Sequence, residues 1–148
     1  MLRRVFHTYW RFKRGATLGV RGLVIDGEGR VLLIRHTYVS GWHLPGGGVE
    51  TGETMLAALT RELREEGNVE LTGAPVLHGI YFNRQASRRD HVALFVVRGF
   101  RQDRAPKPNF EIAECAFFAR GALPDGTTKG TQARIAEVFD GVTGSEFW

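Results

Sequence analysis

Cysteine is almost absent from this sequence, which has a single one, Cys115, in 148 residues. One cysteine excludes a disulfide within the chain and a zinc site built from several thiolates. Because Cys115 stands in an apolar run, we expect it to be a buried structural thiol. This use of cysteine is typical of a reducing compartment, and we expect a cytoplasmic protein.

Long apolar runs are also missing. No stretch approaches the roughly 20 apolar residues that a membrane-spanning helix needs. Because the first residues lack an uncharged apolar centre, we also expect no signal peptide. The sequence therefore predicts a protein without a membrane span. With 43% hydrophobic and 24% charged residues, the composition favours one compact domain over a disordered chain.

Acidic residues are absent from positions 1–14, although this segment is rich in basic ones. The five basic residues are Arg3, Arg4, Arg11, Lys13 and Arg14. Removing these five charges from the net charge of +4 leaves −1 for the rest of the chain. Since the basicity belongs to a short arm and not to the body, we expect no stable nucleic-acid partner.

The same arm has an apolar periodicity. Leu2, Val5, Phe6 and Tyr9 recur at helical spacing, so residues 1–14 are expected to form a basic amphipathic arm ahead of a single domain over residues 15–148. Three roles remain open for it: packing on its own domain or on a sister subunit of a homodimer, contact with an anionic surface, or organelle targeting.

The remaining pattern predicts strands around one central helix and a second helix near the end of the chain. Asp26–Gly29 is expected to join the first two strands as a hairpin, and the run Pro45–Gly48 to form a turn. The expected strands are 16–25, 30–36, 42–44, 69–83, 91–100 and 112–119, and the expected helices are 54–66 and 131–139. This order indicates an α/β fold with a mixed β-sheet between helices.

The central helix carries two kinds of residue at helical spacing. Leu56, Leu59 and Leu63 are expected to form the stripe that docks on the sheet. The carboxylates of the neighbouring face belong to Glu62, Glu65 and Glu66, which lie within one turn. Like charges so close repel, and a divalent cation with its preference for carboxylate oxygens would remove that cost. The alternative is an ordinary solvated face paired with arginines.

The spacing of the glycines and glutamates resembles the signature of the Nudix hydrolase family. Gly47 is followed after five residues by Glu53, and after seven more by the run Arg61 to Glu66. One further residue leads to Asn68 and Val69, and Asn68 is the departure, because the family has glycine there. Asn is the next best residue for the left-handed conformation that ends a helix, so we expect the helix end to survive.

The resemblance implies an α/β/α sandwich and a metal-dependent reaction, the hydrolysis of a diphosphate bond in a nucleoside diphosphate linked to another moiety. The expected cofactor is Mg²⁺ or Mn²⁺. Its ligands, carried over from the family, would be Glu62, Glu65, Glu66 and the Gly46 carbonyl. Metal-activated water would attack phosphorus.

Catalytic roles follow from the same resemblance. Glu62 and Glu66 would act with the metal, and Arg61 with Glu53 would orient the glycine loop against the helix. The general base is either a glutamate of this helix or one from a later segment, for which Glu114 and, less favoured, Glu111 are the candidates.

The substrate is expected to be a small nucleotide-type diphosphate compound, and its identity is not encoded in the central segment. Arg35, Tyr81 and Arg84 are the residues we predict to bind it, by charge or by stacking. Further candidates of the same kinds are Arg21, His36, Trp42, Phe82, Arg88 and Arg89. Two other functions stay open: a Nudix-like nucleotide-binding or regulatory module without catalysis, and an isomerase or basic-arm nucleic-acid binder on the same fold.

Overall fold

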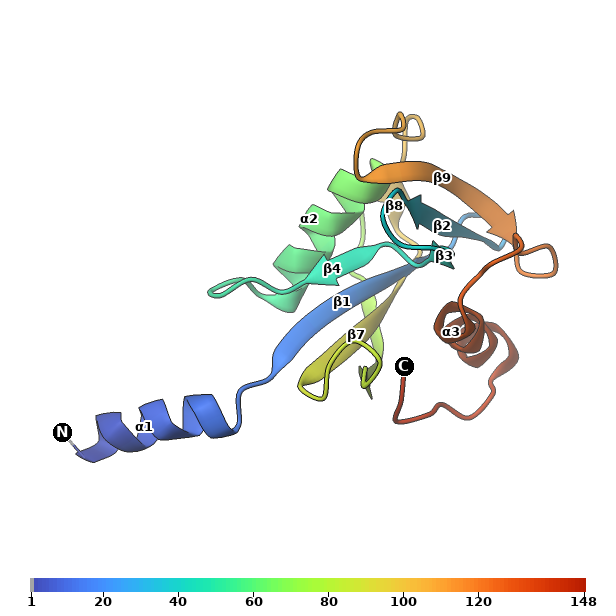
Figure 1. Ribbon diagram of the computed structural model, residues 1–148. Helices are drawn as coiled ribbons and strands as arrows, with labels where there is room; N and C mark the ends of the chain where they lie inside the picture. Colours follow the sequence, from blue (N-terminus) through green and yellow to red (C-terminus); the bar gives the residue numbers. More distant parts are fainter. Residues whose placement is uncertain (1) are drawn as a thin grey trace.

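The computed structural model describes residues 2–148, with side chains from Arg4 onward. The predicted roles of the Leu2 and Arg3 side chains in the arm lie outside this description. The three helices are α1 (Leu2–Lys13), α2 (Met55–Gly67) and α3 (Lys129–Asp140). Figure 1 shows α2 and α3 on opposite sides of the strands, while α1 projects away from them. The predicted α/β/α arrangement is confirmed.

The strands form three sheets. A four-stranded sheet has the order β4-β1-β7-β6, a three-stranded sheet the order β3-β2-β9, and β5 pairs with β8. Their bounds are β1 (Thr17–Val24), β2 (Arg30–His36), β3 (Trp42–His43), β4 (Gly46–Gly48), β5 (Glu70–Leu71), β6 (Val76–Phe82), β7 (Asp90–Val97), β8 (Phe100–Arg101) and β9 (Ile112–Ala119). The ladder between β1 and β7 is parallel and its neighbours in the sheet are antiparallel, so the sheet is mixed, as predicted.

Two apolar clusters fill the space on either side of the strands. The cluster under α2 includes Val20, Leu32 and the helix residues Leu59 and Leu63. The cluster under α3 includes Leu23, Leu33, Trp42, Tyr81 and Ile135. Successive strand residues therefore alternate between the two cores, as the pleat of a β-strand requires. This alternation decides which side chains face α2.

The predicted hairpin between the first two strands is wrong. The turn itself forms, because the Asp26 carboxylate accepts from the backbone N–H groups of Glu28 at 3.0 Å and Arg30 at 2.8 Å. Beyond the turn, Ile25 and Val31 form only an isolated bridge. Both edges of β1 are occupied by β4 and β7, so β2 joins a different sheet.

Other predicted elements were too long or of the wrong kind. The strand expected over 69–83 is two strands, β5 and β6, separated by a segment with Gly73 and Pro75, whose ring removes a backbone donor. The strand expected over 91–100 likewise divides into β7 and β8. The glycine run is a strand and not a turn, since Gly46–Gly48 pairs antiparallel with Gly19–Arg21 of β1.

Candidate active site

Helix α2 begins and ends within one residue of the predicted bounds, at Met55 and Gly67. The Thr54 hydroxyl caps the start by accepting from the Ala57 N–H at 3.1 Å. At the other end Asn68 adopts the left-handed conformation, with φ 51° and ψ 38°, and its N–H donates to the Arg64 carbonyl at 3.1 Å. The prediction that Asn68 replaces glycine at the helix end is confirmed. Leu59 and Leu63 are fully buried, but Leu56 is 50% exposed, and the small side chain of Ala58 fills the third buried position instead.

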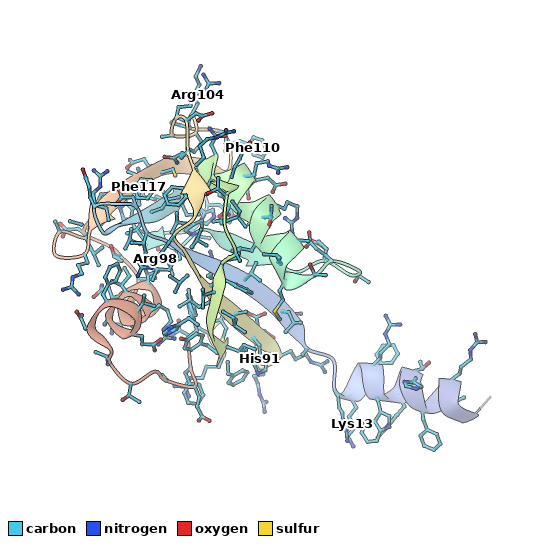
Figure 2. The ribbon with its side chains drawn as sticks, turned by 180° about the vertical axis from the view of Figure 1, so that it is seen from behind. Lys13, His91, Arg98, Arg104, Phe110 and Phe117 are labelled. Atoms are coloured by element: carbon cyan, nitrogen blue, oxygen red, sulfur yellow. The ribbon has the colours of Figure 1, made fainter. Side chains whose placement is uncertain are left out.

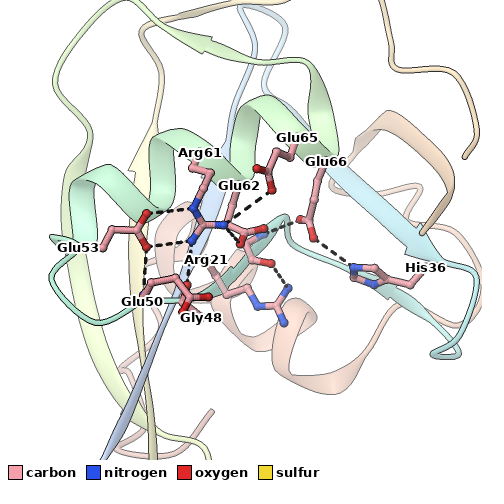
Figure 3. Close-up of polar contacts among 10 residues, drawn as sticks. Arg21, His36, Gly48, Glu50, Glu53, Arg61, Glu62, Glu65 and Glu66 are labelled. Carbon is pink, nitrogen blue, oxygen red and sulfur yellow. Dashed lines mark hydrogen bonds and ion pairs between the residues drawn. The ribbon is translucent and has the colours of Figure 1, made fainter. Parts of the chain in front are cut away.

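Glu66 lies inside the molecule and not on a solvated face. Its residue is only 4% exposed, and each carboxylate oxygen has a partner from a different strand. One oxygen accepts from the Gly46 N–H of β4 at 2.8 Å, and the other lies 3.2 Å from Nε2 of His36 on β2. Glu66 thus joins α2 to both sheets (Figure 3).

Glu62 occupies the next position along the same cleft. Burial raises the pKa of its carboxyl, the ion pair with Arg61 at 2.6 Å opposes that rise, and the negative charge of Glu66 adds to it. A Cβ on Gly47 would lie 2.4 Å from a Glu62 oxygen, and a Cβ on Gly46 would lie 2.0 Å from the Val20 carbonyl oxygen. Only glycine permits this approach of strand β4 to β1 and to the carboxylate.

The predicted contact between Glu53 and Arg61 is present. The guanidinium donates through Nε and Nη2 to the two oxygens of Glu53, each at 2.9 Å, and Nη2 also donates to the Gly48 carbonyl at 3.1 Å. This bidentate pair lowers the pKa of Glu53 to about 2. Because Glu53 also accepts from the Glu50 N–H at 3.1 Å, the loop before α2 is tied to the helix and to β4.

Glu65 stands apart from the other two glutamates of the triplet. Its side chain is 60% exposed and turned towards Arg61, 3.7 Å away. Within the described residues, no group of three or more Asp, Glu, His or Cys side chains is arranged closely enough to coordinate a metal ion. The predicted convergence of all three carboxylates is therefore not formed in this arrangement, in which Glu62 and Glu66 share the cleft and Glu65 lies at its edge.

The cationic side chain of Arg21 lines the cleft and binds the backbone beside β4. The Arg21 guanidinium donates to the Leu44 carbonyl at 2.8 Å and to the Gly46 carbonyl at 3.4 Å. Burial lowers the pKa of Arg21, and the nearby charges of Glu66 and Glu62 oppose this shift. Arg21 therefore holds the carbonyl that the sequence predicted as a metal ligand.

Glu62 and Glu66 line a hollow of about 390 Å³. Glu62, Glu66, His36, Arg21 and Glu111 are among the residues that line it. A larger hollow of about 750 Å³ shares Arg21 and His43 with it and extends to the aromatic side chains at the end of the chain. The carboxylates therefore face one hollow that adjoins a larger one, and together these have room for a ligand.

Glu114 lies outside this cleft, contrary to the sequence-based preference for it over Glu111. The next residue, Cys115, packs towards α2, so Glu114 points to the opposite face of β9, where it forms an ion pair with Arg35. Arg35 is thereby also held away from the cleft. Glu111, which precedes the strand, lies at the cleft instead. The buried position of Cys115 is as expected, and burial raises the pKa of its thiol to about 12.

The other two predicted substrate contacts, Tyr81 and Arg84, lie in different surroundings. Tyr81 is 3% exposed in the core under α3, where its hydroxyl donates to Glu137 at 2.6 Å, so it offers no ring for stacking. Burial, followed by the Glu137 carboxylate, raises the pKa of Tyr81. Arg84 is exposed and its guanidinium lies 4.6 Å from the centre of the Phe147 ring, beside the larger hollow.

His36 is a site residue whose role the sequence did not reveal. The sequence makes His36 a candidate contact for the substrate, whereas in the structure its Nε2 contacts the Glu66 carboxylate. Its side chain is 8% exposed, and within the described part of the chain its Nδ1 has no hydrogen-bond partner. The alternation Leu32, Ile34, His36 along β2 is the signal that could have placed it on the α2 face.

These observations define an α/β/α sandwich whose central helix presents carboxylates to a glycine strand, and comparisons with known proteins agree with that class. The model of the NUDIX domain family matches residues 15–139. The chain belongs to the NUDIX family, and the predicted family and fold are confirmed.

Individual relatives cover parts of the chain. An RNA pyrophosphohydrolase of Halorhodospira halophila is 52% identical over 44 residues, 30% of this chain and 24% of that protein. A MutT-like protein of Streptomyces ambofaciens is 36% identical over 67 residues, 45% of this chain and 43% of that protein. The matched segments thus span less than half of these two proteins.

A solved structure matches the fold more fully. The MutT NUDIX hydrolase from Burkholderia pseudomallei superimposes with a TM-score of 0.71 and 23% identity, covering 83% of this chain and 98% of that one. This likeness concerns the fold.

Proposed function

We propose that this chain is a metal-dependent pyrophosphohydrolase, which cleaves a diphosphate bond in a nucleoside diphosphate linked to another group. The observation that carries the proposal is the cleft in which Glu62 and Glu66 of α2 face strand β4. The names of the pyrophosphohydrolase and MutT-like relatives support it.

The donor set of the cleft fits a hard divalent cation. Carboxylate oxygens of Glu62, Glu65 and Glu66 and the Gly46 carbonyl oxygen are of the type that Mg²⁺ and Mn²⁺ prefer. The glycine at position 47 leaves space beside Glu62 that a side chain would fill. When bound, a divalent cation supplies positive charge for the diphosphate oxygens and makes an attacking water more acidic.

The chain's own residues would orient and polarise the substrate. Arg61, already held by Glu53, keeps the glycine strand against α2, so the carboxylates meet the diphosphate in a fixed geometry. Arg21 places a buried cation beneath the cleft. Glu111, at the margin of the hollow, is the residue we propose to accept the proton of the attacking water.

The larger hollow would receive the nucleoside. Phe147 and Trp148 line it together with the amides of Asn83 and Gln85, and these groups combine an apolar surface with hydrogen-bonding atoms. Its position next to the carboxylates would allow one ligand to occupy both hollows.

The proposal is tested by phosphate release with and without Mg²⁺. The panel comprises nucleoside triphosphates, dinucleoside polyphosphates, ADP-ribose, nucleotide sugars and, because of the name of one relative, an RNA with a 5′-triphosphate. Metal-dependent release from at least one compound is expected. Nucleotide binding without any turnover at millimolar metal would favour the catalytically inactive module instead.

The proposed base is tested with a matched pair of variants. Glu111→Gln should lower turnover by about 10²-fold or more, as expected for loss of a general base, while Glu114→Gln should leave it nearly unchanged. The opposite ranking would show that the residue on the far face of β9 reaches the cleft during the reaction.

A further inference from the structure

Helix α1 stands clear of the rest of the molecule. Figures 1 and 2 show it projecting beyond the end of β1, and Figure 2 shows its side chains spread around the helix, clear of the body. Its visible attachment is at its end, where Nη1 of Arg89 donates to the carbonyls of Phe12 and Gly15, each at 3.3 Å. The described structure therefore excludes the expectation that the arm packs on its own domain in this conformation.

The exposed helix is amphipathic. At 100° per residue, Val5, Phe6, Tyr9 and Phe12 fall on one side, and Arg4 and Arg11 on the other. Lys13, at the end of the helix, lies on the apolar side, with its Nζ 5.6 Å from the centre of the Tyr9 ring. Phe12 is 77% exposed, Val5 64% and Phe6 55%, so large apolar side chains that are normally covered face solvent.

The positive charge of the arm limits which kinds of partner could cover the apolar side of α1. Residues 1–14 contain five basic side chains and no acidic one, while the rest of the chain carries a net charge of −1. A second copy would bring another helix of the same charge and a nearly neutral body, which compensates little of the repulsion. A nucleic acid would neutralise the basic side but leave the aromatic side in water.

An anionic lipid surface would interact favourably with both the basic and the apolar side of α1. Its headgroups attract arginine and lysine, and the boundary with its acyl chains accepts the aromatic and aliphatic side chains. We propose that α1 binds peripherally to membranes rich in anionic lipid and so places the catalytic domain at their surface. With 12 residues the helix is about 18 Å long, too short to cross a bilayer, so it would lie in the interface.

The test is co-sedimentation of the full chain with vesicles. Vesicles of phosphatidylcholine alone are compared with vesicles containing about one third phosphatidylglycerol. We expect binding to the anionic vesicles only, and a loss of binding as salt is raised.

Three double variants separate the contributions. Arg4→Gln with Arg11→Gln should weaken vesicle binding by about 25-fold, or about five-fold for each charge. Phe6→Ser with Phe12→Ser should reduce it at least as strongly, because it removes the apolar anchor. The matched control is Arg98→Gln with Arg104→Gln, which removes the same charge from exposed positions away from the arm and should bind as the wild type does (Figure 2).

The catalytic domain provides an internal control, because the arm variants should retain hydrolysis of a soluble substrate. Equal binding to both kinds of vesicle, or binding that the Arg98 and Arg104 control loses as strongly, would overturn the proposal. The proposal would also fail if the wild type bound no vesicles and formed a dimer that the Phe6 and Phe12 variant converts to a monomer. It would fail equally if the wild type bound an oligonucleotide through the arm but bound no vesicles.

Discussion

Glu66→Gln separates the chemical role of this carboxylate from its structural role. Glu66 accepts from the Gly46 N–H at 2.8 Å and lies 3.2 Å from Nε2 of His36. In the variant, the amide oxygen can keep the bond from Gly46, but the amide NH₂ can donate to His36 Nε2 only if the ring proton moves to Nδ1, which is buried without a partner. One contact survives and the other is exchanged for a buried unpaired N–H, so the free energy of unfolding should fall by about 1–2 kcal/mol.

Turnover should respond much more strongly than stability. The variant removes a negative charge from the proposed metal and diphosphate site, and a loss of about 10²–10³-fold is expected, similar to removal of one preorganised electrostatic group. Glu66→Ala provides the contrast, because it leaves both the buried Gly46 N–H and His36 Nε2 without a partner and should destabilise the fold by about 2–5 kcal/mol.

The assays are urea denaturation and metal-dependent phosphate release on the same preparations. Glu70→Gln serves as the surface control, since it breaks only an exposed ion pair with Arg101 and should change neither quantity measurably. Turnover of Glu66→Gln within about three-fold of the wild type at saturating metal would refute the assignment of this carboxylate to the reaction. A stability loss well above about 2 kcal/mol would refute the proposed exchange of hydrogen bonds.

Three further outcomes are expected. Asn68→Ala should cost about 1–2 kcal/mol of stability in denaturation, because alanine lacks the short polar side chain that lets asparagine tolerate the left-handed region, whereas Asn68→Gly should be near neutral; equal costs would contradict the helix-end argument. Tyr81→Phe should destabilise the fold by about 1–3 kcal/mol by removing the hydroxyl bound to buried Glu137, yet leave the KM for any substrate unchanged; a raised KM would return Tyr81 to the binding site. Because Arg61 holds the folded-state pKa of Glu53 at about 2, below the ordinary 4.5, the stabilisation is complete above pH 4.5 and is lost as the pH falls towards 2. The difference in unfolding free energy between the wild type and Glu53→Gln should therefore shrink over that interval, and a difference independent of pH would count against the ion pair.

The parts of the site that the sequence predicted well are fixed by local structure. Thr54 and Asn68 act through backbone groups a few residues away, so the bounds of α2 could be inferred without knowing the fold. The contact of Glu53 with Arg61 also follows from the spacing of one loop and the helix after it. Leu56 shows the limit of this reasoning, because helical spacing does not state how wide the buried face is.

The errors concern contacts between segments far apart in the chain. The turn at Asp26 is encoded locally, but the departure of β2 from β1 depends on which strands occupy the edges of β1. Similarly, the sequence does not state which face of β9 carries Glu114, because strand alternation assigns it a face only relative to a neighbour such as Cys115. The burial of Tyr81 depends on α3, which is distant in sequence.

The position of β1 also has a consequence for the order of folding. Its parallel ladder with β7 joins Thr17 to Asp90, which are 73 residues apart, whereas β6 and β7 are neighbours in the chain. Closing the longer loop costs more conformational entropy before any contact compensates it, so a pairing of high contact order forms later than a local hairpin. The glycine strand and α2 both rest on β1. The cleft is therefore expected to be among the last parts of the molecule to assemble, and a chain still emerging from the ribosome would acquire its carboxylate site only after β7 has been synthesised.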